Sequence, residues 1–139
     1  MGITRHEIRE SEFIFIFEKA FRDESPAELI EISKDNEAVT VNEEVISTVE
    51  GVYEHLEEID AVISQFSTKR SLERIPKLNL AALRLAVYEI KYLSDRIPIK
   101  VSINEAVGLV NKYAQESDVT FVNGVLGAYS RSLGSGSLT

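Results

Sequence analysis

The 139-residue sequence contains no cysteine and no apolar run long enough to span a bilayer. The first absence excludes a disulfide framework, a thiolate metal site and a cysteine nucleophile. The second excludes a membrane-spanning helix. The opening residues, MGITRHE, lack the apolar core of a secretory signal, and His6 stands where a myristoylation signal needs Ser or Thr. We therefore expect a cytoplasmic protein with no membrane partner.

Acidic residues exceed basic ones, which gives a formal net charge of −8, but the excess is uneven. Residues 1–22 are balanced, with four basic and four acidic side chains. Residues 23–66 carry thirteen acidic side chains and one basic one, whereas residues 67–139 carry ten basic and six acidic ones. A basic surface built from the N-terminus and the C-terminal half therefore remains possible despite the net charge.

Two helix starts in the N-terminal half are marked by capping residues. Thr4 is followed three residues later by Glu7, and Ser25 is followed by Pro26 and Glu28. Serine and threonine at these positions accept hydrogen bonds from the first free N–H groups of a helix. The sequence therefore predicts helices that begin after Thr4 and Ser25, and the next apolar pattern predicts a third helix that begins around Asn42.

The run FIFIF at residues 13–17 fits a strand as well as a helix. We favour a helix because the period of three to four residues continues beyond the run. Its expected inward positions are Phe13, Ile16, Phe17, Ala20 and Phe21. Ile8 and Phe15 lie on the opposite face, so this helix is either central or half covered by a partner.

Apolar residues spaced by three and four along 45–66 predict one long helix or two nearly collinear helices. The opposite face is rich in glutamate and is expected to face solvent. His55 and Glu58 share a helical face but form at most half of a metal site, so no metal and no cofactor are expected. Adjacent carboxylates such as Glu57 and Glu58 point to different faces and do not form an acid–base pair.

In the C-terminal half, Pro76 is expected to end any preceding helix at Ile75, and an almost wholly apolar helix follows over 79–93. Residues 94–101 are expected to form an extended connector. Ser102 and Glu105 have the spacing of a capping box at the start of the next helix.

The segment TFVNGVLGAYS, residues 120–130, contains Asn-Gly, which often marks a β-hairpin. A hairpin needs alternation on both sides, whereas apolar residues here recur at helical spacing, so we predict a helix. Two interior glycines cost about 1 kcal/mol each relative to alanine. We therefore expect a close neighbour at Gly124 and assign it to a packed helix. The expected fold is all-α, with one domain over residues 1–133 and a flexible tail over 134–139.

Three motifs occur in order, namely LRLAVYE at 83–89, INEA at 103–106 and FVNG at 121–124. Together they resemble the family of the bacterial transcription antitermination factor NusB, with the clear match over residues 72 to 130. The resemblance implies about seven helices in two packed bundles and a factor that is not an enzyme, with no catalytic residues. It also implies binding of boxA RNA in ribosomal RNA transcripts, together with the small-subunit ribosomal protein NusE and RNA polymerase.

The resemblance suggests candidate site residues. Those for RNA are Arg5, His6, Arg9, Lys100, Lys112, Phe121 and Asn123, and those for the protein partner are Tyr88 and Glu89. The free protein is expected to be a monomer or a weak homodimer. The basic N-terminal stretch of the family is thinned here, Thr120 replaces a common basic residue before FVNG, and Asn111 another after the INEA helix. RNA binding is therefore expected to be retained, but to be weaker for the protein alone and more dependent on the protein partner.

Several roles remain open. Phe121 is either a core residue or a platform for base stacking, and Asn123 either braces a helix or contacts RNA. Arg84 reaches the surface or pairs with a carboxylate such as Glu105. The alternative function is a helical adaptor that keeps the ribosomal-protein partner but has little RNA affinity of its own.

Overall fold

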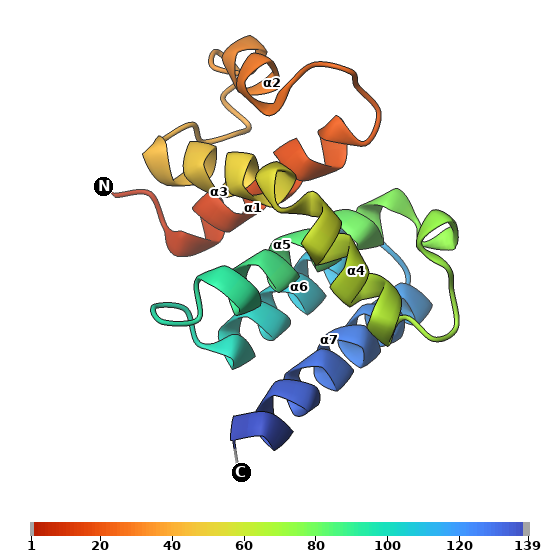
Figure 1. The fold of residues 1–139 in the computed structure, drawn as a ribbon. Coiled ribbons are helices and arrows are strands. Elements are labelled where there is room, and N and C mark those ends of the chain that lie inside the picture. Colours follow the sequence, from red (N-terminus) through yellow and green to blue (C-terminus); the bar gives the residue numbers. More distant parts are fainter. Residues whose placement is uncertain (1, 138–139) are drawn as a thin grey trace. The chain divides into compact units, whose positions relative to one another are not determined.

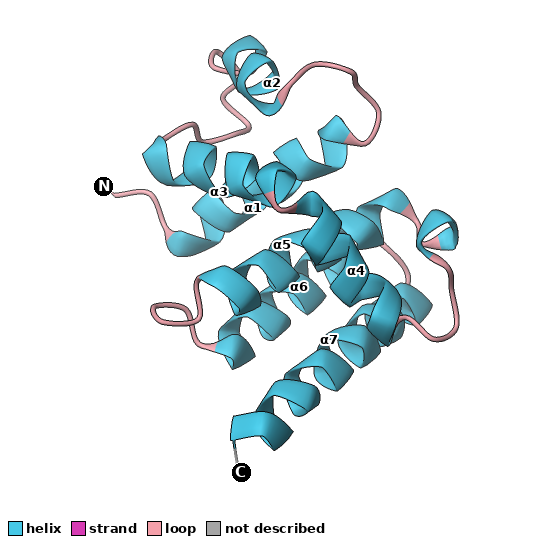
Figure 2. Cartoon of the chain, in the orientation of Figure 1, coloured by secondary structure: helices cyan, strands magenta, loops and turns pink. Residues whose placement is uncertain are grey.

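A computed structural model describes residues 2–137, and the side chains up to residue 134. Within this range the chain forms α-helices and one short 3-10 helix, with no strand (Figures 1 and 2). The helices are α1 (Arg5–Lys19), α2 (Pro26–Ile32), α3 (Glu43–Glu54), α4 (Leu56–Phe66), η1 (Leu72–Arg74), α5 (Lys77–Tyr92), α6 (Ile99–Tyr113) and α7 (Glu116–Ser137). They divide into two compact units, residues 1–56 and 57–139. The predicted all-α fold with two bundles is confirmed.

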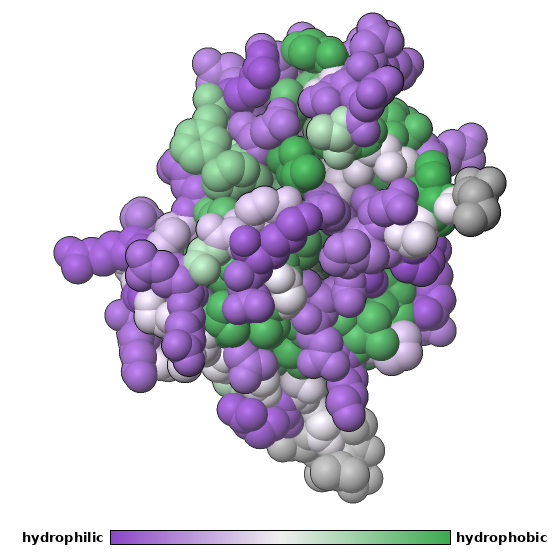
Figure 3. Space-filling view, turned by 180° about the vertical axis from the view of Figure 1, so that it is seen from behind, coloured by the Kyte–Doolittle hydropathy of each residue, from purple (hydrophilic) through white to green (hydrophobic). Residues whose placement is uncertain are grey.

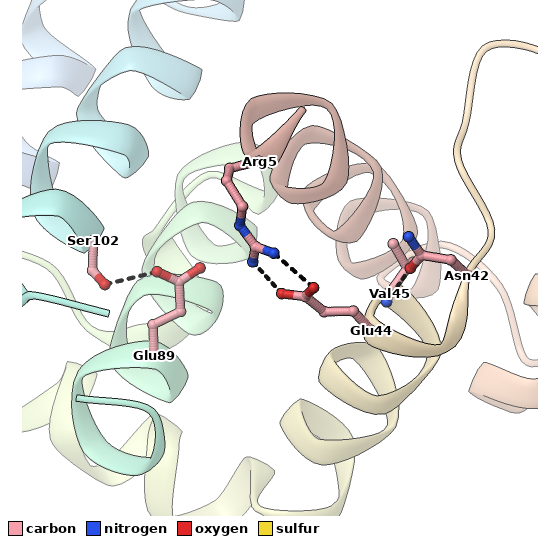
Figure 4. Close-up of polar contacts among 6 residues, drawn as sticks. All are labelled: Arg5, Asn42, Glu44, Val45, Glu89 and Ser102. Atoms are coloured by element: carbon pink, nitrogen blue, oxygen red, sulfur yellow. Dashed lines mark hydrogen bonds and ion pairs between the residues drawn. The ribbon is translucent and has the colours of Figure 1, made fainter. Parts of the chain in front are cut away.

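The first unit begins its helices where the sequence predicts. The Thr4 hydroxyl accepts a hydrogen bond from the Glu7 N–H at 3.1 Å. Ser25 and Glu28 form a complete capping box ahead of α2, with Pro26 at its first position. The Asn42 side chain accepts from the N–H of Val45 at 2.9 Å and starts α3 (Figure 4).

The apolar core of the first unit joins α1, α2 and α3. It consists of Ile8, Phe15, Leu29, Ile30, Val45 and Val49. Phe13 and Ile16, on the other side of α1, are also buried, so α1 is buried on both faces, as one of the two predicted arrangements requires. Phe21 is 62% exposed because α1 ends at Lys19, so its predicted inward position is wrong.

The apolar pattern over residues 45–66 corresponds to two helices. α3 ends at Glu54 and α4 begins at Leu56, with His55 between them in a non-helical conformation. The boundary between the compact units falls one residue further on, after Leu56. The segment therefore forms two separate helices rather than one long helix.

In the second unit, α5 packs against both α6 and α7, which explains why it is apolar nearly all round (Figure 1). Ten of its sixteen residues are buried. Ile75 is extended before Pro76, as predicted. Arg84 does pair with a carboxylate, but the partner is Asp60 of α4 rather than Glu105, through two hydrogen bonds of 2.9 Å.

The start of α6 differs from the prediction. The helix begins at Ile99, after Pro98, so residues 99–101 are helical rather than extended and Ser102 lies inside the first turn. Its hydroxyl donates to the Glu89 carboxylate at 2.7 Å instead of capping the helix. Ser102, which the sequence indicates as a helix cap, therefore makes a tertiary contact with α5 instead.

The segment around FVNG is helical, as predicted, since α7 runs through Asn123 and Gly124 without interruption. α7 continues to Ser137, so residues 134–137 of the expected tail are helical, whereas 138–139 lie outside the described residues. Tyr113 and Leu133, which continue the apolar spacing of their helices and lie near the helix ends, are 46% and 39% exposed.

Hydrophilic side chains dominate the face drawn in Figure 3, and apolar ones appear between them as separate areas. The large exposed apolar side chains are Ile3, Phe21, Ile32, Val101, Tyr113 and Leu133. No helix within residues 2–137 combines the length and the apolar character needed to cross a membrane.

Candidate nucleic-acid interface

The N-terminus of α1 presents two of the predicted RNA residues, Arg5 and His6, both exposed. The Arg5 guanidinium is engaged by Glu44 of α3 through two parallel contacts, one of them 2.7 Å long (Figure 4). A bidentate pair of this kind holds the guanidinium in one orientation. An RNA phosphate must therefore compete with Glu44 for Arg5.

Arg9 lies one helical turn beyond Arg5, but it is only 6% exposed. Of these two predicted RNA residues, only Arg5 therefore lies at the surface. From Ile8 onward the residues of α1 are buried or only partly exposed, so the fully exposed part of the helix is its first turn. Burial argues against direct contact between Arg9 and a phosphate.

The two predicted lysines of the second unit are exposed but lie far apart. Lys100 is in the first turn of α6 and Lys112 in its last turn. Twelve residues of helix place them about 18 Å from each other along the axis. Lys112 lies close in sequence to the start of α7, its ammonium 5.2 Å from the centre of the Tyr113 ring.

Phe121 is half-buried in the second turn of α7, and its ring is covered by a residue that sequence reasoning missed. The Arg70 guanidinium carbon lies 4.4 Å from the centre of the Phe121 ring. This is a cation–π contact. Arg70 belongs to the connection between α4 and η1, residues 67–71, which also contains Lys69. The sequence signal that could have indicated this surface was the pair of adjacent basic residues, Lys69 and Arg70.

Hydrogen bonds order the surroundings of Arg70. The buried Ser67 donates its hydroxyl to the Arg70 carbonyl oxygen at 2.6 Å and closes the 67–70 turn. Asp118, in the first turn of α7, accepts from the Asn79 side chain at 2.9 Å and lies 3.8 Å from the Arg70 guanidinium. α5, α7 and the 67–71 connection therefore meet at Asp118.

A pocket of about 490 Å³ opens beside Phe121, between the end of α4, the 67–71 connection and α7. Gly124 lines it, and a side chain at this position would begin in open space, with no atom within 4 Å. The predicted helix contact at Gly124 is therefore wrong. At Gly127 the nearest atom is the end of the Arg131 side chain, at 3.1 Å. Asn123 is exposed and does not brace the core.

The predicted partner-binding residues on α5 differ in exposure. Tyr88 is half-buried and its ring lies 5.4 Å from that of Tyr92. Burial and the hydrogen bond to Glu58 raise the pKa of the Tyr92 phenol to about 12. Glu89 is only 2% exposed and its carboxylate accepts a hydrogen bond from Ser102 inside the protein (Figure 4). Its contact with a partner protein stays a prediction.

Comparison with known proteins extends these observations to the whole chain. The sequence model described as the NusB family matches residues 2–131. The chain belongs to the NusB family. This family membership agrees with the order of the three motifs. The match also includes the first unit, in which none of the three motifs lies.

Two curated relatives within the NusB family show the extent of the match. The transcription antitermination protein NusB of Agathobacter rectalis is 42% identical over 132 residues, covering 92% of this chain and all of the relative. The NusB of Thermoanaerobacter sp. is 44% identical over 101 residues, covering 73% of this chain and 71% of the relative. These relatives are transcription antitermination proteins, so the chain belongs to a family of regulatory factors rather than enzymes.

Solved NusB structures share the fold. T. maritima NusB superposes with a TM-score of 0.82 at 32% identity, covering 94% of this chain and 93% of that one. A structure of the antitermination factors NusB and NusE in complex with double-stranded RNA matches with a TM-score of 0.81 at 30% identity, covering 92% and 96%. That NusB was therefore captured with both a protein partner and RNA.

Proposed function

We propose that this chain is a transcription antitermination factor that binds boxA RNA of ribosomal RNA transcripts. It acts with the ribosomal protein NusE on the RNA polymerase elongation complex. The observation that carries the proposal is the FVNG end of α7, where Phe121 and the exposed Asn123 lie in one turn, with Lys69 and Arg70 beside Phe121. Aromatic rings flanked by cations are typical of surfaces that bind unpaired RNA.

The relatives support the same proposal. One similar NusB structure holds NusE and RNA together, and family membership extends over both units of this chain. Charge distribution supports it as well, because the net charge of residues 67–139 is opposite in sign to that of the whole chain. The surface offered to RNA is therefore local rather than a property of the overall charge.

A specific observation favours a second candidate, an adaptor that binds NusE with little RNA affinity of its own. Arg5 is held by Glu44 and Arg9 is buried, so α1 offers few free cations to phosphate. Under this alternative, the ribosomal protein supplies most of the RNA contacts and the chain mainly positions it.

A titration of the full chain with a boxA-like RNA, with and without purified NusE, separates the two functions. Direct binding by the chain alone that strengthens when NusE is added supports the first proposal. RNA binding that equals the affinity of NusE alone supports the adaptor. If neither combination binds this RNA more tightly than a scrambled sequence, both proposals fail.

A further inference from the structure

The N-termini of α1 and α3 are joined by one ion pair in the first unit (Figure 4). Arg5 is the first residue of α1, and Glu44 is the second residue of α3. The two terminal nitrogens of the Arg5 guanidinium each donate to one oxygen of the Glu44 carboxylate. The residues are 39 positions apart, so the packing of α1 on α3 brings them together rather than a local turn.

The Glu44 carboxylate makes the kind of contact that a phosphate makes with arginine. Carboxylates and phosphates both bind a guanidinium through two parallel hydrogen bonds. A phosphate that binds Arg5 in this way needs the two terminal nitrogens that Glu44 uses in the free protein. Glu44 and such a phosphate therefore exclude each other at this end of the guanidinium.

The position of Glu44 in α3 allows it to release Arg5 at a small cost. Asn42 caps α3, and Glu44 lies in the first turn, where the positive end of the helix dipole stabilises a carboxylate. The carboxylate therefore keeps a favourable environment after the pair opens. The side chains of Arg5 and Glu44 are 61% and 25% exposed, and ion pairs at the surface are weak.

Arg5 in turn has a reason to accept either anion. It lies at the N-terminus of α1, where the positive end of that helix disfavours a cation. A negative group next to the guanidinium offsets this repulsion, and both a carboxylate and a phosphate supply one. The first turn of α1 is exposed, so a phosphate can reach Arg5 from solvent.

We propose that Glu44 is an intramolecular competitor of RNA, which occupies Arg5 in the free protein and lowers the affinity for RNA of any sequence. RNA makes its contact with Arg5 only by displacing Glu44. The inference rests on the proposed RNA-binding function and adds to it a residue that opposes binding. A pair that only fastens α1 to α3 would affect stability and leave RNA affinity unchanged.

The test compares the native chain with Glu44→Gln, which keeps the size of the side chain and removes its charge. Glu43→Gln is the matched control, because Glu43 is an exposed carboxylate in the same turn of α3, whereas Glu44 makes the contact with Arg5. Arg5→Gln is added to the native chain and to each variant. Every full chain is titrated, with NusE present, with a boxA-like RNA and with a scrambled RNA at several salt concentrations.

We expect Glu44→Gln to strengthen the binding of both RNAs by about 1.5- to 5-fold, which is the equivalent of one exposed ion pair. The slope of log affinity against log salt concentration should become steeper by up to about 0.7, the value for one single-strand phosphate contact. Glu43→Gln should produce a smaller change in both. Arg5→Gln should weaken binding more in the Glu44→Gln chain than in the native chain.

The outcomes distinguish this inference from the proposed function. If neither the native chain nor Glu44→Gln binds RNA beyond NusE alone, the proposed function fails and the competitor role fails with it. If the native chain binds RNA and Glu44→Gln and Glu43→Gln change its affinity equally, the competitor role is overturned and the RNA-binding function stands. An equal effect of Arg5→Gln in the native and Glu44→Gln chains overturns it as well. Circular dichroism and thermal melting establish that each variant is folded.

Discussion

Gly124 is a helical glycine whose missing side chain would meet nothing. Gly124→Ala should therefore raise the free energy of unfolding by about 1 kcal/mol through helix propensity alone. Gly108→Ala, at a second open helical position, should produce a similar gain. Urea unfolding followed by circular dichroism measures both. If Gly124→Ala were destabilised while Gly108→Ala was stabilised, residue 124 would have a close contact. That result would contradict the open space around Gly124.

Arg84 and Asp60 form a largely buried pair, with side chains 14% and 18% exposed. Arg84→Met should lower the free energy of unfolding by about 1.5–3 kcal/mol, because Asp60 loses two charge-assisted hydrogen bonds in a site poor in water. Glu24→Gln, which breaks the exposed Arg22–Glu24 pair, should leave the stability unchanged. Equal effects of the two substitutions in urea unfolding would contradict the difference in burial.

At the scale of single elements, α2 depends on its cap because it has only seven residues. Short helices are marginal without tertiary contacts or caps. Ser25→Ala removes the oxygen that accepts from the Glu28 N–H and should cost about 1 kcal/mol of stability. Differential scanning calorimetry would show the lower melting temperature. An unchanged melting temperature would mean that Leu29 and Ile30 alone hold α2 in the core.

The same cap makes the stability of α2 depend on pH. The Ser25 backbone N–H, followed by its hydroxyl, holds the pKa of the Glu28 carboxyl below its usual value. A lowered pKa in the folded state stabilises the protein above the unfolded pKa, and this contribution is lost as the pH falls through the folded pKa. Denaturant unfolding of native and Glu28→Gln chains at neutral and acidic pH should show a smaller pH dependence for the variant. If the stability of both chains changed equally with pH, Glu28 would not contribute to the pH dependence of stability.

Helix starts that depend on neighbouring residues were predictable from the sequence, and those that depend on tertiary contacts were not. Thr4, Ser25 and Asn42 cap helices through bonds that span three residues. Ser102 has the same local appearance, but its hydroxyl is directed to Glu89, thirteen residues away in α5. The spacing of Ser102 and Glu105 does not reveal that Glu89 is the partner of Ser102. The sequence therefore predicted that α6 starts near Ser102, whereas the helix starts at Ile99.

At the scale of the whole molecule, the net charge of −8 means that RNA binding depends on few cations. If Lys112 contacts a phosphate, Lys112→Gln should reduce the slope of log affinity against log salt concentration by about 0.7, the value for one single-strand contact. Lys34→Gln, in the acidic stretch where Lys34 pairs with Glu31, should leave the slope unchanged. Titrations at several salt concentrations measure both. An unchanged slope for Lys112→Gln would remove this lysine from the RNA surface.

The candidate site was only partly predictable for a related reason. The FVNG motif indicated Phe121 and Asn123, because a motif is a local feature of the chain. Arg70 lies fifty-one residues before Phe121, and only the fold brings its guanidinium onto that ring. The burial of Arg9 likewise follows from the packing of α1 on both faces. Helical spacing alone groups Arg9 with Arg5.

The hydrogen bond from Ser67 to the Arg70 carbonyl has a consequence for the survival of the protein in a cell. Lys69-Arg70 is a pair after which trypsin-like proteases cut, and it lies at the surface. Such proteases bind several residues of their substrate in an extended form, which the closed 67–70 turn does not adopt until it opens. We therefore expect cleavage next to Lys69 and Arg70 to require that the hydrogen bond of the Ser67 hydroxyl first breaks.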